Sequence, residues 1–432
     1  MIEVIGAGLA GCEAAYALAK RGVKVALVDM KPKKFTPAHE SSAFCELVCS
    51  NSLKSDDVFG NACGLLKEEM RILGSVTMEA AEVSRIPAGG ALAVDREKFS
   101  AYVTEKIRSE ENIIVVEREQ ETLPEQGIIA TGPLTSDALS VSIEKKFGGG
   151  LHFYDASAPI VAADSIDYNM TFMGDRYGKG TGDYINCPLN KAEYELFVTE
   201  LVSAEKTVLH SFEKREIFEG CMPLEVMASR GKDTLRYGTF KPVGLEWQGT
   251  RPWAVLQLRK ENAAGAAYGL VGCQTNLKFG EQKRVFSLIP ALKNAEFLRY
   301  GVMHRNTYLS SPEILSADFS VKDNPMLFFA GQMTGVEGYV ESAASGLLAG
   351  LNLWRRLVGK ETLVPSERTV LGALARYIAT PNKDFQPMNA NFGILAEGFP
   401  EIRDKKLKKR YLAERALEEI RAFRARLCEE KE

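Results

Sequence analysis

Short runs of apolar residues mark expected strands near both ends of the chain. Residues 2–5 lead into a glycine-rich turn, which is followed by an alanine-rich stretch with helical spacing. A second apolar run lies at 23–28, and the segments 126–132 and 326–332 each have the pattern of a strand that runs into a turn. Apolar runs that alternate with helical segments are typical of parallel strands buried on both faces. The pattern predicts an α/β fold whose sheet draws strands from both ends of the chain.

The middle of the chain has a different pattern. Between about residues 151 and 300 there are more aromatic residues, scattered strand-like runs such as 253–258, and few long helical repeats. Stacked glycines at 148–150 suit a linker, because they favour turns and offer no side chain for packing. We expect a discontinuous Rossmann-like domain formed by residues 1–150 and 301–432, with an inserted mixed α/β domain at 151–300 on the substrate side.

The last predicted element is an amphipathic helix from about residue 404 to residue 427. Apolar residues recur there near the helical period, and a basic cluster occupies 405–410. Such a cluster can contact nucleic acid, but a solvated helix face is the commoner case.

Composition narrows the class of protein. The chain has 432 residues, 45% of them hydrophobic and 26% charged, with a net charge of -3, which is ordinary for a globular protein and excludes disordered and collagen-like chains. The first strand begins at Ile2 and no apolar stretch is long enough for a span, so we expect a cytoplasmic protein without a membrane anchor. Eight cysteines and four histidines show no zinc-like spacing, so we expect no metal, and we expect a monomer or a weak homo-oligomer.

A glycine motif follows the first strand. Gly6, Gly8 and Gly11 form a G-x-G-x-x-G run, in which the first glycine allows the turn, the second lets a pyrophosphate approach and the third lets the helix pack on the strand. Asp29, at the end of the second strand, can accept hydrogen bonds from ribose hydroxyls. The sequence therefore predicts a dinucleotide site, with contacts from Gly6, Ala7, Gly8, Leu9, Ala10, Gly11 and Asp29.

Later segments favour FAD over NAD. The two segments at 126–132 and 326–332 look like flavoprotein segments, and a long helix of small residues begins near Gly338, so that its N-terminal dipole can face a flavin. The small residues at 338–350 suit close helix packing equally well. No second complete glycine motif is present, so a nicotinamide reductant would bind without a Rossmann domain of its own. The expected flavin contacts here are Gly132, Gly331, Gln332, Gly338 and Tyr339.

Two cysteines are candidates for chemistry. Cys49 and Cys221 stand in polar surroundings, and each precedes a predicted helix, one continuing toward residue 70 and one entered at Pro223. A helix dipole and the neighbours Lys54 or Arg230 could favour the thiolate. From these residues alone either cysteine can be the catalytic one. The cysteines expected to be small core residues are Cys12, Cys63 and Cys428.

These motifs carry a family resemblance. The chain resembles the bacterial folate- and FAD-dependent tRNA (uracil-5-)-methyltransferases. The resemblance rests on the glycine run, on the segments 46–53 and 218–223, which hold the two cysteines, and on the segment 332–342. The resemblance runs almost end to end, through 94–100, 271–285 and 385–392. One departure is Asp29, where we expect glutamate in the family; aspartate can make the same ribose contact with a shorter reach.

The resemblance implies a reaction. It implies methylation at C5 of a T-loop uridine in tRNA, with carbon from 5,10-methylenetetrahydrofolate and electrons from NADH or NADPH through FAD. Uracil C5 is a poor nucleophile until a thiolate adds at C6, so an activated cysteine is required. Our hypothesis gives Cys221 the attack on C6, and gives Cys49 a supporting role as a base or as a guard of the flavin, although the two roles can be exchanged.

Substrate contacts are expected from a ring and from a basic surface. Tyr339 is a candidate ring for stacking on the folate, and Lys278, Lys283 and Arg284 are candidates for contacting tRNA phosphates. The target base would have to be flipped out of its folded loop. The alternatives are a related FAD protein of wobble-uridine modification, an FAD oxidoreductase of small molecules, and a non-catalytic RNA-binding flavoprotein.

Overall fold

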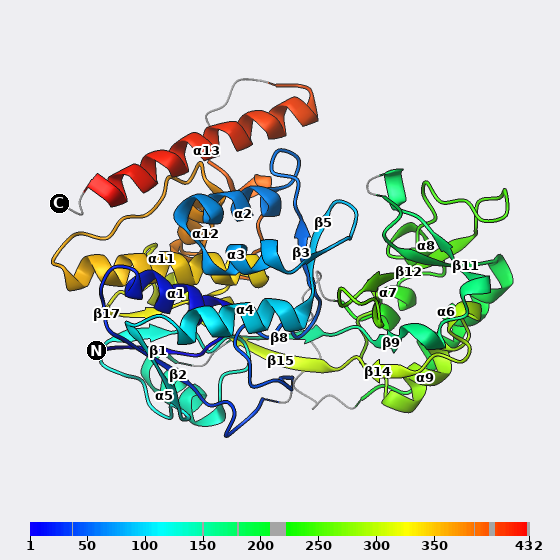
Figure 1. Cartoon of the computed structure of the whole chain (residues 1–432), viewed down its shortest axis with the longest axis horizontal. Coiled ribbons are helices and arrows are strands. Elements are labelled where there is room, and N and C mark those ends of the chain that lie inside the picture. The colour runs from blue at the N-terminus through cyan, green and yellow to red at the C-terminus, as the bar shows by residue number, and fades with distance from the viewer. Residues whose placement is uncertain are drawn as a thin grey trace.

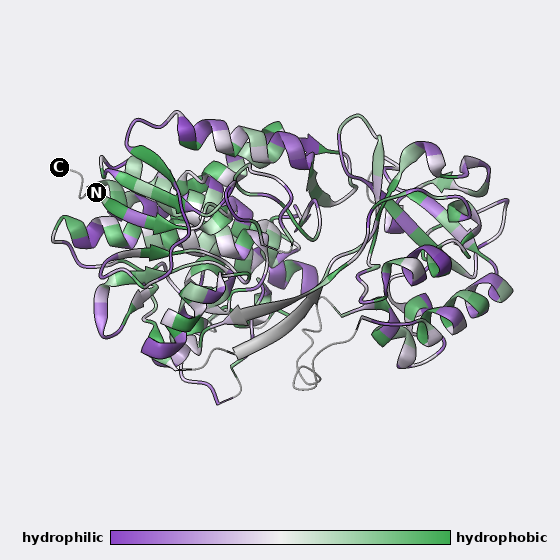
Figure 2. Ribbon diagram, turned by 90° about the horizontal axis from the view of Figure 1, so that it is seen from below, coloured by the Kyte–Doolittle hydropathy of each residue, from purple (hydrophilic) through white to green (hydrophobic). Residues whose placement is uncertain are grey.

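The protein consists of two lobes of unequal size (Figure 1). The computed structural model describes residues 1–36, 38–148, 151–178, 181–207, 222–383, 385–396 and 402–429, with side chains at 151–155 and 304–307 outside the description. The large lobe holds the two ends of the described chain, and the small lobe is built from its middle. Figure 2 shows apolar residues concentrated along the inner strands and helices of both lobes.

A six-stranded sheet forms the centre of the large lobe, with the strand order β16-β17-β7-β1-β2-β6. All neighbours are parallel except β16, which pairs with β17 in the antiparallel direction. The strands are β1 (Ile2–Ile5), β2 (Val25–Asp29), β6 (Ile113–Glu117), β7 (Gly127–Ile129), β16 (Ser320–Val321) and β17 (Asn324–Phe329). The predicted α/β fold, with one sheet assembled from both ends of the chain, is confirmed.

Helices cover this sheet, and two of them approach each other closely. The large-lobe helices are α1 (Leu9–Ala19), α2 (Ala62–Leu73), α3 (Val76–Val83), α4 (Arg96–Arg108), α5 (Asp137–Phe147), α10 (Ser311–Ile314), α11 (Tyr339–Leu357), α12 (Val370–Ala379) and α13 (Lys405–Glu429). A Cβ added to Gly346 of α11 would lie 2.0 Å from the carbonyl oxygen of Ala10 in α1. The small residues of α11 therefore serve helix packing, beside any role near a flavin.

The closing helix is where the sequence places it, since α13 spans Lys405–Glu429 and packs along α2. Cys12 and Cys63 are buried, as expected. Cys428 is exposed, so its prediction as a core residue was wrong. It follows Leu427, which takes the buried position of the last turn, and the next residue along the helix points away from the core.

A small three-stranded sheet flanks the large lobe, with the order β3-β5-β4. It is formed by β3 (Ser52–Ser55), β4 (Arg85–Ile86) and β5 (Ala91–Val94). This sheet faces the small lobe (Figure 1).

The small lobe is built on a second six-stranded sheet, with the order β10-β11-β12-β13-β9-β14 and antiparallel pairing throughout. Its strands are β9 (Ile160–Ala162), β10 (Phe172–Met173), β11 (Ile185–Leu189), β12 (Ala254–Lys260), β13 (Ala267–Leu270) and β14 (Phe297–Arg299). Its helices are α6 (Lys191–Ser203), α7 (Leu224–Ser229), α8 (Thr234–Tyr237) and α9 (Phe279–Phe286). A separate core that includes Phe197, Phe240 and Phe286 holds it together.

The antiparallel pair β8 (Leu151–Ala156) and β15 (Met303–Tyr308) flanks the small-lobe segment in sequence. The chain therefore enters and leaves this lobe along adjacent strands, as an inserted segment does.

Candidate active site

The glycine turn after β1 has the geometry that its sequence requires. Gly6 has φ +102°, which only glycine adopts without strain. A Cβ at Gly11 would lie 1.7 Å from the carbonyl oxygen of Gly6, so this position must lack a side chain for α1 to follow the strand so closely. A Cβ at Gly8 would meet no atom within 4 Å, because Gly8 faces open space at the start of α1. The turn therefore leaves a helix N-terminus accessible to an anionic group.

A large pocket opens where the carboxyl ends of β1, β2, β7 and β17 meet, and it encloses about 1270 Å³, including the part open to solvent. This edge is where doubly wound sheets bind ligands. The pocket brings together these predicted residues: Gly6, Ala7, Gly8, Leu9, Ala10, Asp29, Cys49, Gly132, Gly331, Gln332 and Tyr339. Two predicted contacts, Gly11 and Gly338, do not line the pocket.

Asp29 connects two backbone segments at the pocket. Its Oδ2 accepts a hydrogen bond from the backbone N–H of Ala7 at 2.7 Å, and its Oδ1 accepts one from Lys31 at 2.8 Å. The carboxylate thus holds the glycine turn against the residues that follow β2, and it remains part of the pocket wall. The aspartate side chain, which is shorter than that of glutamate, therefore binds to backbone N–H groups of the protein itself.

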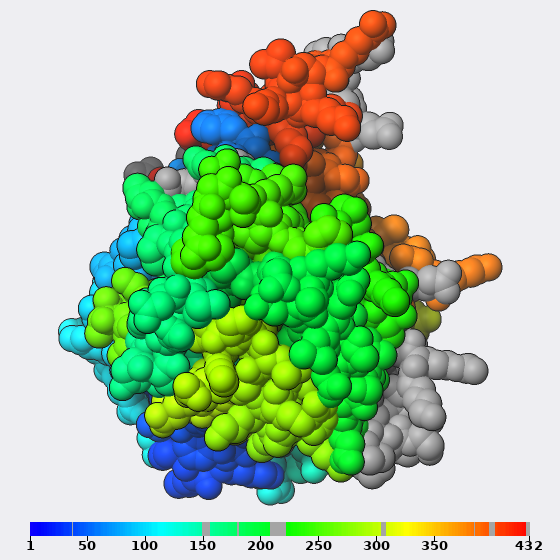
Figure 3. Space-filling model, turned by 90° about the vertical axis from the view of Figure 1, so that its right-hand side faces the viewer, coloured from blue at the N-terminus to red at the C-terminus, as the bar shows by residue number. Residues whose placement is uncertain are grey.

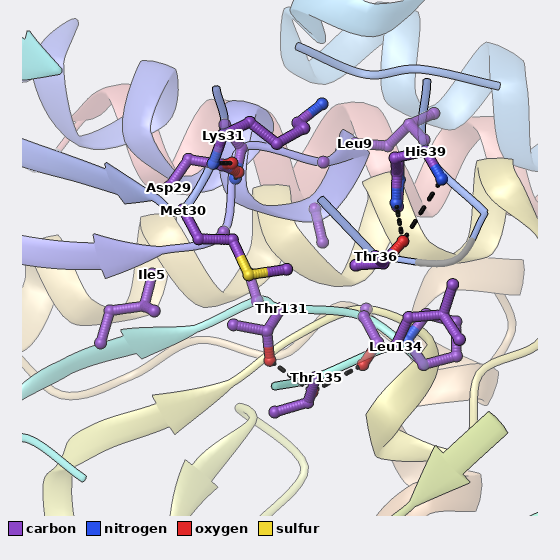
Figure 4. A pocket seen from close by; sticks show the side chains of 18 of the residues that line it. Ile5, Leu9, Asp29, Met30, Lys31, Thr36, His39, Thr131, Leu134 and Thr135 are labelled. Carbon is purple, nitrogen blue, oxygen red and sulfur yellow. Dashed lines mark hydrogen bonds between the residues drawn. The ribbon is translucent and has the colours of Figure 1, made fainter. Parts of the chain in front are cut away.

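The loop after β2 contributes residues that the sequence analysis missed. Thr36 Oγ1 and His39 Nδ1 lie 2.6 Å apart, and both side chains line the pocket (Figure 4). Burial lowers the pKa of His39. The Lys31 ammonium donates to the carbonyl oxygens of Ala43 at 2.7 Å and Ser41 at 3.2 Å, which shapes the loop. These residues could have been predicted from their position in the chain. A loop at the carboxyl end of a parallel strand next to the glycine turn borders the ligand site.

The opposite wall includes the segment after β7. Thr131 and Thr135 are joined through their hydroxyl groups at 2.6 Å, and Thr135 donates to the carbonyl oxygen of Gly132 at 3.0 Å (Figure 4). Gly132 has φ +70°, and a Cβ there would meet no atom within 4 Å, so the backbone of this turn is exposed to the pocket.

Cys49 is half-buried at the pocket and is held by its backbone. The Tyr339 hydroxyl accepts hydrogen bonds from the N–H of Cys49 at 2.7 Å and from the N–H of Ser50 at 3.3 Å. Burial raises the pKa of Tyr339 well above its ordinary value, so the phenol is neutral at physiological pH. Tyr339 therefore joins the start of α11 to the cysteine loop, and its stacking on a folate stays a prediction.

The prediction that Cys49 precedes a helix was wrong. Residues Ser52–Ser55 form β3, which pairs with β5, and α2 begins only at Ala62, where Asn61 caps it by accepting from the Cys63 N–H at 3.0 Å. The Ser50 and Ser52 hydroxyls accept from backbone N–H groups two residues further on, a turn geometry that competes with a helix start. No helix dipole therefore acts on this thiol from α2.

The expected basic neighbour of Cys49 is also engaged elsewhere. The Lys54 ammonium pairs with the buried Glu341 carboxylate of α11 at 3.2 Å. Cys221 lies outside the described residues, and so does its surrounding segment 208–221. Downstream of it, α7 begins at Leu224 directly after Pro223, as the proline predicted.

The three basic candidates for tRNA lie on or next to α9 in the small lobe, and none of them lines the pocket. The Lys278 ammonium pairs with Glu205 at 2.5 Å, and Arg284 pairs with Glu281 at 2.8 Å and with Glu200. Lys283 is exposed. Carboxylates thus already neutralise two of the three cations.

The described ranges contain no group of three or more histidine, cysteine, aspartate or glutamate side chains arranged to hold a metal ion. Likewise, none of the helices described above is both long and apolar enough to cross a bilayer.

The fold and the pocket together define a dinucleotide-binding protein of the flavoprotein type. The residues fit FAD: an open glycine turn at a helix N-terminus suits its pyrophosphate, Asp29 lies next to that turn, and Gly331 and Gln332 come from a second strand end, which is the flavoprotein arrangement.

Comparison with known proteins identifies the family. A family model described as glucose inhibited division protein A matches residues 1–361. The solved structure of GidA from Aquifex aeolicus (form II crystal) superposes with a TM-score of 0.72 at 17% identity, covering 99% of this chain and 73% of that chain, which shows the fold.

Curated relatives are much closer in sequence. The methylenetetrahydrofolate--tRNA-(uracil-5-)-methyltransferase TrmFO of Acetivibrio thermocellus is 56% identical over 429 residues, covering 98% of each chain. The same-named protein of Lactobacillus acidophilus is 55% identical over 436 residues, covering 99% of each chain. The chain therefore belongs to the TrmFO family, which confirms the resemblance seen in its motifs.

Proposed function

We propose that this protein transfers a one-carbon unit from 5,10-methylenetetrahydrofolate to C5 of a uracil in tRNA and reduces it to a methyl group, with FAD as bound cofactor. The end-to-end identity with the TrmFO proteins supports this function. The observation that carries it is the pocket, because the dinucleotide fingerprint and Cys49 line one cavity. The matches to the glucose inhibited division protein A model and to the GidA structure show the fold and do not favour the alternative, wobble-uridine modification.

Side chains of the protein activate the uracil for reaction at C5. A cysteine thiolate adds to C6, which forms an S–C bond and moves the electron pair toward C5 and O4. C5 then bonds to the methylene carbon as one of its two C–N bonds to the folate opens, and a base takes the C5 proton. The second C–N bond breaks as tetrahydrofolate leaves, and the S–C bond breaks when the methylene carbon is reduced to methyl. When bound, FAD supplies the electron pair that takes the carbon from the formaldehyde level to methyl. We assign the attack to Cys221 and the supporting role, as base or as guard of the flavin, to Cys49.

The finer statements belong to the same proposal. The target is a T-loop uridine, the reductant is NADH or NADPH, and the protein works in the cytoplasm as a monomer or weak homo-oligomer. Residues 1–150 and 301–432 form the FAD-binding domain, and residues 151–300 form the inserted domain. The antiparallel pairing of β8 with β15 supports these boundaries.

Label transfer tests the function. Purified holoenzyme, labelled methylenetetrahydrofolate, NADPH and unmodified tRNA should give 5-methyluridine in the T-loop. A protein that binds FAD and leaves the tRNA unlabelled would contradict the proposal and favour the wobble-uridine alternative. Cys49→Ser and Cys221→Ser should each lower the rate at least about 100-fold.

The same variants test the assignment of roles. With tRNA containing 5-fluorouridine, which prevents loss of the C5 substituent, Cys49→Ser should still form a covalent enzyme–RNA adduct and Cys221→Ser should not. An adduct of normal yield in Cys221→Ser, mapped to Cys49, would reverse the two roles.

A further inference from the structure

The loop that carries Cys49 is held by residues from the other lobe. Arg259, near the end of β12, donates from Nε to Asn51 Oδ1 and from Nη2 to Ser50 Oγ, each at 2.7 Å. These acceptors belong to the two residues that directly follow Cys49. A single guanidinium thus makes two hydrogen bonds, in its fork geometry, to the segment that sets the course of the cysteine backbone.

Asn51 links the cysteine loop to both lobes, and we call this contact region the junction. Asn51 is fully buried, and its Nδ2 donates to the carbonyl oxygen of Lys260 in the small lobe at 2.9 Å and to that of Val94 in the large lobe at 3.0 Å. With Oδ1 bound to Arg259, every polar atom of this side chain has a partner. A buried, fully satisfied amide of this kind fixes one arrangement of its neighbours.

The residues before Cys49 are held at the same junction. Arg96, at the start of α4, donates from Nη1 to the carbonyl oxygens of Leu47 and of Val48, the latter at 3.2 Å. Its Nε pairs with the buried Glu261 carboxylate of the small lobe at 2.7 Å. The backbone is therefore held on both sides of Cys49, and Tyr339 of α11 holds the N–H of Cys49 itself.

We propose that Arg259 is a positioning residue for Cys49: it fixes the cysteine loop at the pocket and makes the position of this thiol depend on the docking of the small lobe. The inference deepens the proposed function, because it concerns the cysteine to which that function gives a supporting role. A lobe carrying the proposed tRNA surface would, through Arg259, act directly on the loop beside the flavin pocket.

Several charged and titratable groups surround the Cys49 loop and influence the pH dependence of its thiol. They include Tyr339 of α11, Arg96 of α4, Arg259 of β12, Glu261 directly after β12 and Glu46 in the loop itself. Tyr184, directly before β11, also interacts with Arg259 through a side-chain hydrogen bond. Losing the Arg259 cation should disfavour the Cys49 thiolate, and losing its two hydrogen bonds should loosen the loop. Alkylation of Cys49 reports both effects, through the pH at half-maximal rate and through the rate at high pH.

The experiment uses FAD-loaded full-length protein and iodoacetamide, and quantifies the Cys49 peptide by mass spectrometry across pH. In Arg259→Gln the midpoint should move up by at least about half a pH unit and the rate at high pH should rise several-fold. Arg259→Lys keeps the charge and one hydrogen bond, so its midpoint should return toward that of the parent. Arg176→Gln is the matched control, because this arginine donates to the carbonyl oxygens of Thr239 and Val255 within the small lobe.

A profile of Arg259→Gln that coincides with those of the parent and of Arg176→Gln would overturn the inference. If Arg259→Gln does not fold, Ser50→Ala tests the same contact from the loop side, and it should raise the rate at high pH with the parent's midpoint. An unchanged rate in that variant would also overturn the inference. Full methyl transfer by Cys49→Ser would remove the proposed role of Cys49, whereas the alkylation profiles would still decide whether Arg259 positions the loop.

Discussion

At the scale of single residues, Tyr339 combines a ring and a hydroxyl that have different tasks. The hydroxyl accepts from the N–H groups of Cys49 and Ser50, and the ring forms part of the pocket wall. The two tasks can be separated, because phenylalanine keeps the ring and removes the acceptor.

Tyr339→Phe should lower kcat about tenfold or more and leave the KM for methylenetetrahydrofolate unchanged. The physical reason is that two partly buried N–H groups lose their partner, at a cost of about 1–3 kcal/mol, so the loop no longer stays in its working position. Tyr339→Leu removes the ring as well and should raise the folate KM in addition. Steady-state kinetics of both variants decide the matter, and a wild-type kcat in Tyr339→Phe would show that the hydroxyl is not needed.

Sequence reasoning found the residues whose role follows from local spacing. Gly6, Gly8 and Asp29 were predictable because a turn, a helix start and a strand end lie within one short βαβ unit. Arg259 was not predictable, since it meets Ser50 and Asn51 only through the packing of two lobes, across more than two hundred residues of chain. The helix expected after Cys49 failed because serine hydroxyls bond to the local backbone there, and the segment pairs with β5 instead.

At the scale of elements, α1 and α11 cross at glycines. A Cβ on Gly346 would come within 2.0 Å of the Ala10 carbonyl oxygen, and one on Gly350 within 2.7 Å of the Ala14 carbonyl oxygen. Both are backbone atoms, which cannot swing aside as the end of a side chain can. The pocket depends on this crossing, because α1 carries the glycine turn at its start and α11 begins with Tyr339.

Gly346→Ala should therefore destabilise the protein by about 3 kcal/mol and weaken FAD binding, since the added methyl group forces the two helices apart. Thermal unfolding and flavin content measure the two effects. Gly280→Ala in α9 is the matched control: a Cβ there meets nothing within 4 Å, so helix propensity predicts a gain of up to about 1 kcal/mol. Equal stability of the two variants would contradict the role of the crossing.

A second contact between elements joins α2 to the start of α12. The fully buried Glu69 carboxylate accepts from the N–H groups of Val370 at 2.8 Å and Leu371 at 2.9 Å. Burial raises the pKa of Glu69 to about 8, against the effect of the two hydrogen bonds. The folded state therefore binds a proton more tightly than the unfolded state, in which a glutamate titrates near pH 4.3.

The sign of the pH dependence follows from this difference. Between about pH 5 and pH 8 the folded state holds the proton that the unfolded state has lost, so the free energy of unfolding falls as pH rises, by about 1.4 kcal/mol per pH unit. Glu69→Gln removes this contribution, so the free energy of unfolding of this variant should depend less on pH. Urea titrations at several pH values across that range measure this dependence. The same substitution at Glu68, which is partly exposed, is the control and should keep the parental slope. Parallel slopes for the parent and Glu69→Gln would contradict the raised pKa.

At the scale of elements, the buried strands of the large-lobe sheet were predictable because continuous apolar runs have few alternatives. The α2–α12 contact was not, because Glu69 looks in sequence like any charged position on a helix. Only the tertiary structure shows that it is fully buried and that its partners are two N–H groups three hundred residues away.

At the scale of the whole molecule, basic residues outside the pocket lie on both lobes. The flavin pocket lies in the large lobe, whereas Lys278, Lys283 and Arg284 lie on the small lobe. A second basic segment, with Lys405 and Lys406 exposed, begins α13, which projects above the small lobe when the molecule is viewed from that end (Figure 3). With a net charge of -3, binding of tRNA has to depend on such local surfaces.

The α9 surface can be tested by salt dependence. Replacing Lys278, Lys283 and Arg284 together by alanine should weaken tRNA binding about tenfold or more near physiological salt, because cations are lost and the carboxylates of Glu200, Glu205 and Glu281 are left to repel phosphates. The slope of log affinity against log salt should shrink by about one for each phosphate contact removed, while kcat at saturating tRNA stays unchanged. Filter binding across a salt series measures both quantities.

Two further double variants serve as a control and as a test of a second basic surface. Lys145→Ala with Lys146→Ala, on α5 at the far side of the large lobe, removes two exposed cations and should leave the slope unchanged (Figure 1). Lys405→Ala with Lys406→Ala tests the start of α13. Since each removed phosphate contact lowers the slope independently, a reduced slope for both the α9 and the α13 variants would mean that tRNA spans the two lobes. A reduction for α13 alone, with the α9 slope at the parental value, would move the RNA surface to the large lobe and contradict the assignment to α9.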